Sequence, residues 1–126
     1  MDFDTLVTQI DENGDFHDRD HAQDALTAVL AVLGERLEGG SPRNLAAQLP
    51  GEAADALPPQ GGAQSFGIDE FDRLVAKQES RGCSPAAAHA HAVAVMNTVL
   101  RCVTTGEAKK IASQLPSEYS DLVPVL

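Results

Sequence analysis

The sequence predicts an all-α protein, and three observations carry that prediction. The 126 residues are 43% hydrophobic but only 4% aromatic, so alanine, leucine and valine must fill the core. Alanine and leucine favour helices, whereas the β-branched and aromatic residues that favour strands are a minor share. Apolar residues recur at helical spacing, and a short segment appears twice. A chain of this length is expected to form a single domain over residues 1–126.

The repeated segment divides the chain into two similar halves. Residues 45–50 read LAAQLP and residues 111–116 read IASQLP, so the offset is 66 positions. The apolar stripes of the preceding helices match at the same offset: Leu26, Val29, Leu30, Leu33 and Leu37 against Ala92, Val95, Met96, Val99 and Val103. We therefore expect two similar four-helix halves, 1–57 and 66–126, joined by a linker at 58–65 and related by a pseudo-twofold axis.

The first two helices are defined by residues that start and stop helices. The first is expected at about 2–12, where Asn13-Gly14 ends it. Asp18 is a good N-cap, so the second helix begins directly after it. This long helix is expected to end near residue 38, because Gly39-Gly40 follows.

Two shorter helices complete the first half. Ser41 as N-cap and Pro42 at the first helical position predict the start of the third helix. That helix is expected to end at residue 49, because Pro50 displaces the residue before it from the α region. Pro50 then opens a fourth helix, which runs to about residue 57.

The second half repeats these elements after a linker rich in proline and glycine. Ser84-Pro85 starts its long helix with a cap followed by proline. Its four helices are expected at 68–79 or 80, 85–103, 106–114 and 116–122. Both long helices are apolar around most of their circumference, which indicates burial. We expect these two helices to form a central pair that the shorter ones cover.

Several of these segments resemble a known family. They are residues 35–40 (ERLEGG), 44–50 (NLAAQLP), 70–75 (EFDRLV) and 114–116 (QLP). They are similar to the bacterial and archaeal domain-of-unknown-function family 2267, and the resemblance covers nearly the whole chain. It implies a small all-α domain built from two similar halves, and it brings no catalytic residues with it.

The chain is acidic, and its charge is uneven. Nine basic and nineteen acidic residues give a net charge of −10. Residues 1–63 hold twelve acidic and three basic residues, whereas residues 64–126 hold seven and six. This charge repels phosphate backbones, so we expect no nucleic-acid partner. No apolar run approaches about 20 residues, so we expect no membrane partner either.

The cysteines and the N-terminus predict a cytoplasmic protein with free thiols. The acidic N-terminus lacks the basic and apolar segments of a secretory signal. Two cysteines do not make a disulfide framework, and the helix between Cys83 and Cys102 holds them roughly 27 Å apart. Cys83 precedes a helix N-terminus, so we expect a lowered pKa and consider a redox role for it.

Known motifs of catalysis or calcium binding are not matched. Residues 11–15 (DENGD) begin like a calcium loop, but Phe16 and Ala22 stand where an EF-hand needs glycine and glutamate. The sequence contains no Gly-rich phosphate loop and no serine-centred nucleophile elbow. We therefore assign no catalytic residue and expect no cofactor.

The four histidines do not predict a metal site. His17 and His21 have the spacing of two metal ligands on a helix, but an N-cap at Asp18 leaves His17 outside it. His89 and His91 are two positions apart and face roughly opposite sides of their helix. His91 stands where the first half has an alanine of buried type, so we interpret it as an interior histidine. We expect no bound metal.

The leading hypothesis is a non-catalytic helical module that binds another protein. The alternative is a small-ligand binder or enzyme with a pocket between the halves, lined by Arg36, His91 and Gln114. A filled Ala/Val/Leu interface favours the module, and a deep pocket with convergent polar groups favours the alternative.

Gln48 and Gln114 occupy equivalent positions in the two halves. We expect their side-chain amides to bond backbone carbonyls left open at helix ends. The other interpretation is a paired binding site across the pseudo-twofold axis.

A basic stripe is the candidate interaction surface. Arg73, Lys77 and Arg81 follow one another at intervals of four, which places them on one helix face. Either this face is simply solvated, with Glu70 and Asp72 in partial balance, or it docks on an acidic surface. The acidic first half of a second copy would suit it, so a protein partner or weak, salt-sensitive self-association is expected.

Overall fold

The computed structural model describes residues 1–124, and every regular element in that range is a helix. The elements are α1 (Phe3–Asn13), α2 (Arg19–Arg36), α3 (Ser41–Ala46), α4 (Gly51–Ala54), α5 (Ile68–Glu79), α6 (Pro85–Cys102), α7 (Thr105–Ser113) and the 3-10 helix η1 (Ser117–Leu122). The prediction of an all-α protein is confirmed.

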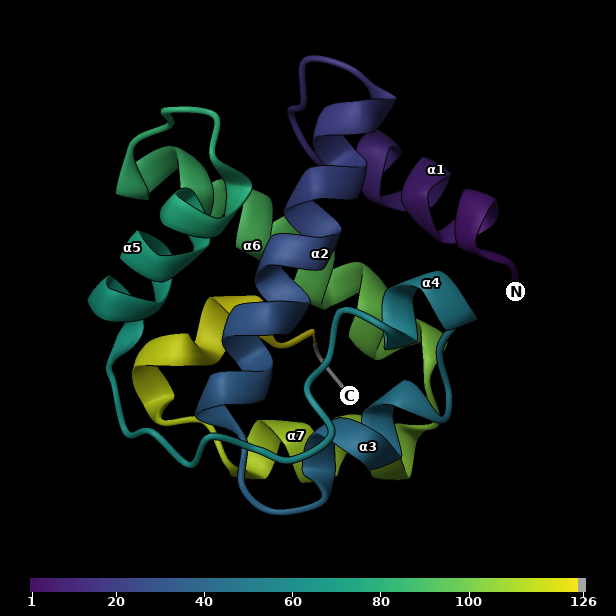
Figure 1. The fold of residues 1–126 in the computed structure, drawn as a ribbon, viewed down its shortest axis with the longest axis vertical. Helices are drawn as coiled ribbons and strands as arrows, with labels where there is room; N and C mark the ends of the chain where they lie inside the picture. The colour runs from purple at the N-terminus through teal and green to yellow at the C-terminus, as the bar shows by residue number, and fades with distance from the viewer. Residues whose placement is uncertain (125–126) are drawn as a thin grey trace.

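The two long helices, α2 and α6, occupy the middle of the molecule. They are in contact and cross near its centre, with α2 in front (Figure 1). Helices α1 and α5 lie on opposite sides of α2, and each also packs against α6. Helices α3 and α7 contact each other at the lower end (Figure 1). The predicted central pair is therefore present, with shorter helices around it.

The apolar stripes predicted for the long helices form the core. Leu26, Val29, Leu30, Leu33 and Leu37 are fully buried, as are Ala92, Val95, Met96 and Val99. Val103, the last member, is half-buried and packs against the core. Phe71 and Val75 of α5 are also fully buried. Helix α5 packs more extensively against each long helix than those two do against each other, because helices that cross meet only around one point.

The long helices begin where the sequence predicts. The side chain of Asp18 accepts a hydrogen bond from the backbone N–H of His21, and Ser84 accepts one from that of Ala87. The predicted N-cap at Ser41 is wrong, because α3 begins at Ser41 itself and has Gly40 at the cap position. The hydroxyl of Ser41 instead accepts a hydrogen bond of 2.7 Å from the side chain of Gln114.

Several helix ends differ from the predicted ones by one to three residues. Helix α2 ends at Arg36 rather than 38, and α3 ends at Ala46 rather than 49. After α3 the chain forms tighter turns, in which the N–H of Gln48 bonds the carbonyl of Leu45. Helix α4 likewise ends at Ala54 rather than 57. Helix α6 ends one residue before the predicted position, and α7 begins one residue before its predicted start. The last helix is of the 3-10 type.

The predicted linker is attached to the end of α2 rather than free. The backbone N–H groups of Gly61, Gly62 and Ala63 donate hydrogen bonds of 2.8–3.0 Å to carbonyls within residues 34–39. A Cβ atom on Gly61 would collide with the carbonyl of Leu37, so glycine is needed for this close approach. In Figure 1 the segment runs across the lower front of the molecule from α4 to α5.

Gln48 and Gln114 bond across the molecule rather than at their own helix ends, so the expected local bonds are wrong. The side-chain oxygen of Gln48 accepts from the backbone N–H of Thr104, at 2.9 Å. The side-chain oxygen of Gln114 accepts from the backbone N–H of Glu38, also at 2.9 Å. Both bonds cover the start of a short helix in the other half of the chain.

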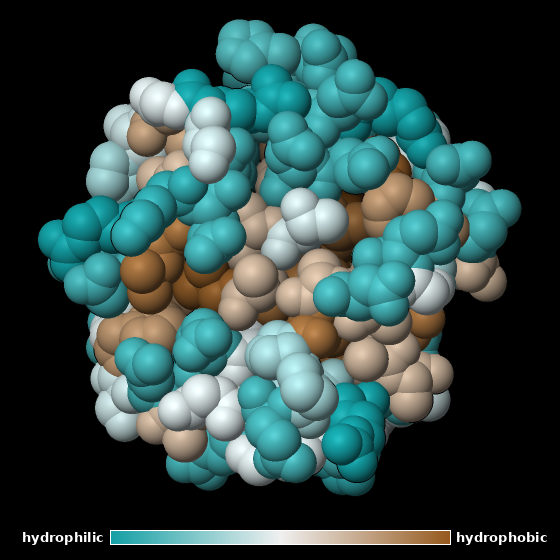
Figure 2. Space-filling model, viewed as in Figure 1, coloured by the Kyte–Doolittle hydropathy of each residue, from teal (hydrophilic) through white to brown (hydrophobic). Residues whose placement is uncertain are grey.

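The surface is predominantly polar. Met1 is the one large hydrophobic side chain that is exposed among residues 1–124. In Figure 2 polar residues cover most of the rim, and apolar residues show between them near the middle of the face. None of the helices in the described range is both long and apolar enough to cross a membrane.

The core predicts the effect of charges placed at its centre. Leu30→Asp and Met96→Asp each bury an unpaired carboxylate at a fully buried site. We expect each to cost several kcal/mol, a large part of a domain's usual stability of about 5–15 kcal/mol. Thermal unfolding followed by circular dichroism measures this. The control Asp15→Ala changes an exposed residue and should alter the free energy of unfolding by less than about 0.5 kcal/mol. A wild-type melting temperature for either core variant would contradict the central-pair arrangement.

Candidate functional site

A large groove lies between α5, α6 and η1. Its volume is about 730 Å³. Its lining residues are Ile68, Asp69, Asp72, Arg73, Pro85, Ala86, His89, Glu118 and Asp121. Four of these are acidic, whereas Arg73 and the histidine His89 are basic, so acidic groups are in excess in the groove. We call it the acidic groove.

A histidine between two aspartates ties the three elements of the acidic groove together. The Nδ1 atom of His89 lies 2.9 Å from the carboxylate of Asp72 on α5, and Nε2 lies 2.6 Å from that of Asp121 on η1. A ring that donates from both nitrogens is protonated. Burial lowers the pKa of His89, but the hydrogen bonds to Asp121 and Asp72 outweigh it and raise the pKa above 6.5. Burial raises the pKa of Asp72.

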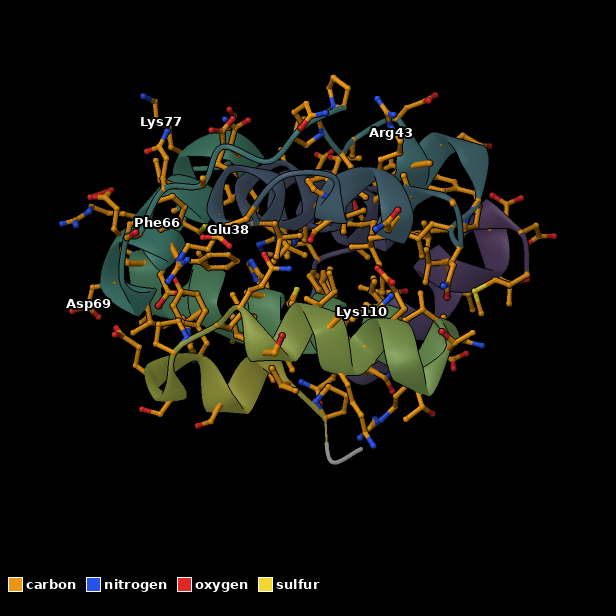
Figure 3. All side chains as sticks on the ribbon, turned by 90° about the horizontal axis from the view of Figure 1, so that it is seen from below. Glu38, Arg43, Phe66, Asp69, Lys77 and Lys110 are labelled. Carbon is orange, nitrogen blue, oxygen red and sulfur yellow. The ribbon has the colours of Figure 1, made fainter. Side chains whose placement is uncertain are left out.

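The N-terminus of α5 forms one edge of the acidic groove. Glu118 accepts a hydrogen bond of 2.8 Å from the backbone N–H of Ile68, because the cap residue Gly67 has no side chain to do so. Asp69, in the same first turn of α5, is exposed and extends from the edge of the molecule in Figure 3. The groove therefore combines the buried Asp72 with three exposed carboxylates, of which Glu118 and Asp121 also hold the structure together.

A second cluster of polar side chains is buried between α2, α5 and α6. His21 and Glu79 are each 4% exposed, and His91 is 7% exposed. Glu79 Oε1 lies 3.2 Å from His21 Nε2, and Glu79 Oε2 lies 3.0 Å from His91 Nδ1. We call these three residues the buried His–Glu–His cluster. The prediction that His91 is a satisfied interior histidine is confirmed.

Each member of the cluster is placed by its position on its helix. His21 lies in the first turn of α2, directly after the Asp18 cap. Glu79 is the last residue of α5, which ends because Ser80 adopts a left-handed conformation. Sequence reasoning compared His21 only with its neighbour His17 and missed Glu79. A signal was present, since Glu79 continues the buried i, i+4 series of Phe71 and Val75.

Hydrogen bonds define where the protons of the cluster lie. The backbone N–H of His17 donates to Nδ1 of His21 at 3.1 Å, so the ring proton of His21 is on Nε2 and is donated to Glu79. His91 donates its Nδ1 proton to the other carboxylate oxygen. The thiol of Cys83 lies 4.0 Å from that same oxygen. Both carboxylate oxygens of the buried Glu79 therefore have hydrogen-bond partners.

A cavity of about 220 Å³ lies beside the cluster. His21, His91, Cys83, Phe16 and Asp15 are among its lining residues. The ring of Phe16 packs against both histidines, with ring centroids 5.2 Å from His21 and 5.0 Å from His91. The cavity gives the cluster a route to solvent.

The cysteines are free thiols at the two ends of α6, as predicted. The predicted lowering of the Cys83 pKa is wrong. Burial raises the pKa of Cys83, and the nearby negative charge of Glu79 raises it further. Burial also raises the pKa of Cys102. Burial therefore opposes the reactive thiolate form at both cysteines.

The residues predicted to line a pocket between the halves have separate partners. Arg36 donates to the carbonyl of Phe66 at 2.9 Å and lies over the ring of Tyr119. His91 bonds Glu79, and Gln114 bonds the turn before α3. Fully buried Ala, Val and Leu side chains fill the contact between α2 and α6.

The predicted basic stripe is partly neutralised within the chain. Arg73 pairs with Glu70 at 3.0 Å, and Arg81 donates two hydrogen bonds to Asp24 at 3.0 and 2.7 Å. Arg81 also lies beyond the end of α5, so the spacing of four does not continue along one helix. Lys77 is exposed and extends outward in Figure 3.

His89 predicts a pH dependence of stability. Because its folded pKa is raised above its ordinary value of 6.5, its stabilising contribution is complete below that pH and is lost as pH rises through the folded pKa. We expect His89→Gln to destabilise by about 1 kcal/mol at pH 6 and by less at pH 9. Urea unfolding at both pH values measures the difference, and an equal loss at both would contradict a protonated His89.

Comparison with known sequences places the chain in a family. The sequence model of one family, described as an uncharacterized conserved protein (DUF2267), matches residues 3–122. This range includes α1 through η1, and with them the acidic groove and the buried cluster. A search of curated proteins found no match. The chain belongs to the DUF2267 family.

Proposed function

We propose that this protein is a non-catalytic helical module that binds another protein, and that the acidic groove accepts a basic segment of its partner. The single observation that carries the proposal is the groove itself: about 730 Å³ lined by four carboxylates against one arginine and one histidine. A lysine or arginine side chain fits this charge and size. A phosphate backbone would be repelled by it.

The distribution of charge favours association with a basic partner. The chain has a net charge of −10, which raises the rate of encounter with a cationic protein. Asp69 and Glu118 are exposed at the groove, so an incoming cation can reach them. Arg73 is already paired with Glu70, which reduces its opposition to a cationic ligand. The filled contact between α2 and α6 favours this module over an enzyme with a pocket between the halves.

We also propose that the chain is one domain made of two similar halves, 1–57 and 66–126, related by a pseudo-twofold axis. The hydrogen bonds of Gln48 and Gln114 support this, because their partners Thr104 and Glu38 are also separated by 66 positions. A cytoplasmic location is part of the proposal and is supported by two free cysteines.

A basic peptide tests the groove. We expect a lysine- and arginine-rich peptide to bind the wild-type chain in calorimetry, with an affinity that falls as salt rises. Asp69→Asn with Glu118→Gln should weaken binding about tenfold or more, since it removes two groove charges without changing shape. Asp11→Asn with Glu12→Gln on α1 removes the same charge elsewhere and is the matched control. Equal weakening by both pairs would contradict a specific groove.

Sedimentation separates a foreign partner from a second copy. If Arg73, Lys77 and Arg81 bind an acidic surface of another copy, the wild type associates at low salt and Arg73→Glu with Lys77→Glu does not. We expect a monomer for both proteins, because Arg73 and Arg81 already have partners within the chain.

The two glutamines test the relation between the halves. Gln48→Ala and Gln114→Ala each remove one hydrogen bond to a backbone N–H of the other half, so each should cost about 1 kcal/mol. Gln23→Ala, at an exposed position of α2, is the control and should cost less than about 0.5 kcal/mol. A clear loss for one glutamine and none for the other would contradict equivalent roles.

A further inference from the structure

We propose that His21, Glu79 and His91 form a binding site for one divalent transition-metal ion, with Zn²⁺ as the representative. This differs from the expectation drawn from sequence, which was that no metal binds and which compared His21 only with His17. The three ligands come from three helices and are separated by 58 and 12 positions in the chain. The folded structure alone brings them together.

The donor atoms have a spacing that suits a metal ion. One atom from each residue lies within 4.8 Å of the others. Ligands about 2.0–2.1 Å from a tetrahedral zinc ion lie roughly 3.3 Å from each other. Glu79 Oε1 lies 3.2 Å from His21 Nε2, and Glu79 Oε2 lies 3.0 Å from His91 Nδ1, so each histidine lies within a few tenths of that value from one of the two carboxylate oxygens. An ion would take the place of the two protons that the histidines donate to Glu79.

The chemistry of the ligands selects the class of ion. Two imidazoles and one carboxylate are ligands that zinc and its first-row neighbours prefer, whereas magnesium and calcium prefer oxygen alone. The side chain of Glu79 is fully buried. Its negative charge offsets part of the charge of a divalent ion in this buried site, which favours binding.

Three protein ligands leave a fourth position for a water molecule. The cavity beside the cluster is lined by both histidines and can supply that water. The site has the composition of a zinc centre with one open position. Cys83 lines the same cavity, but its thiol is not among the three donor groups of the site.

Binding requires a change of proton position in both histidines. His91 must release its Nδ1 proton and hold one on Nε2 instead, and the ring lies beside the cavity. His21 must hold its proton on Nδ1, where the N–H of His17 now donates. That hydrogen bond must therefore break when the ion binds. His17 is exposed and lies between α1 and α2, so its amide can turn to solvent.

Metal titration of the full chain tests the site. After chelator treatment, the wild type should bind Zn²⁺ with one-to-one stoichiometry in calorimetry. Co²⁺ should give the visible absorption of a low-symmetry, four- or five-coordinate ion. Glu79→Gln keeps the shape but weakens a ligand, so its affinity should fall by more than roughly 100-fold, beyond the usual effect of an outer-shell change. Glu70→Gln on the same helix and His17→Asn are the controls and should bind within about threefold of wild type.

A second measurement on the wild type does not depend on any variant folding. Paramagnetic Co²⁺ should broaden the ring resonances of His21 and His91 most strongly, and the His17 amide should shift as its hydrogen bond breaks. Cys83→Ser should still bind. The proposal is overturned if the wild type binds no metal or if folded Glu79→Gln binds the metal as tightly as the wild type. It is also overturned if the broadening is strongest at His17 or His89, or if Cys83→Ser loses metal binding as completely as Glu79→Gln.

Discussion

The contact between α2 and α6 is the constraint on which the other elements depend. Both helices have 18 residues, and every other helix in the described range is shorter. Short helices are marginal in water on their own, so they need an apolar surface to pack against. Leu30 and Met96 lie at the centre of that surface and are fully buried. Small alanines let the two helices approach closely, and α1 and α5 then cover them from the sides (Figure 1).

Helix α5 connects this core to both polar sites. Its apolar face buries Phe71 and Val75, while Asp72 and Glu79 are also buried and meet histidines of α6. The two acids are two helical turns apart, and they meet two histidines that face different sides of α6. One pair lies at the acidic groove and the other is enclosed between helices. A single helix pair therefore produces a solvent-facing site and a buried one, with different chemistry.

The start of the long helices and the positions of the core were predictable from sequence because they depend on near neighbours. Asp18 and Ser84 cap helices through residues three positions later, and the stripe of Leu26, Val29 and Leu30 repeats within one helix. Helix ends were less predictable, since the turns after α3 and α4 are tighter and their hydrogen bonds join residues three positions apart. The attachment of residues 61–63 to α2 was also missed, because glycine and proline content indicates a loop but not what the loop contacts.

The sequence by itself determined the helical class, the membership of residues in the core and the capped starts of α2 and α6. Only the tertiary structure decided which polar residues meet. Glu79 bonds His21 across 58 positions, and Gln48 bonds Thr104 across 56. For the same reason Arg73, Lys77 and Arg81 do not form the uniform basic stripe that was predicted, since Arg81 donates a hydrogen bond to Asp24 of α2. Helix formation depends on the spacing of apolar residues along the chain, whereas a polar site depends on how helices cross. The local spacing of residues does not indicate where helices cross.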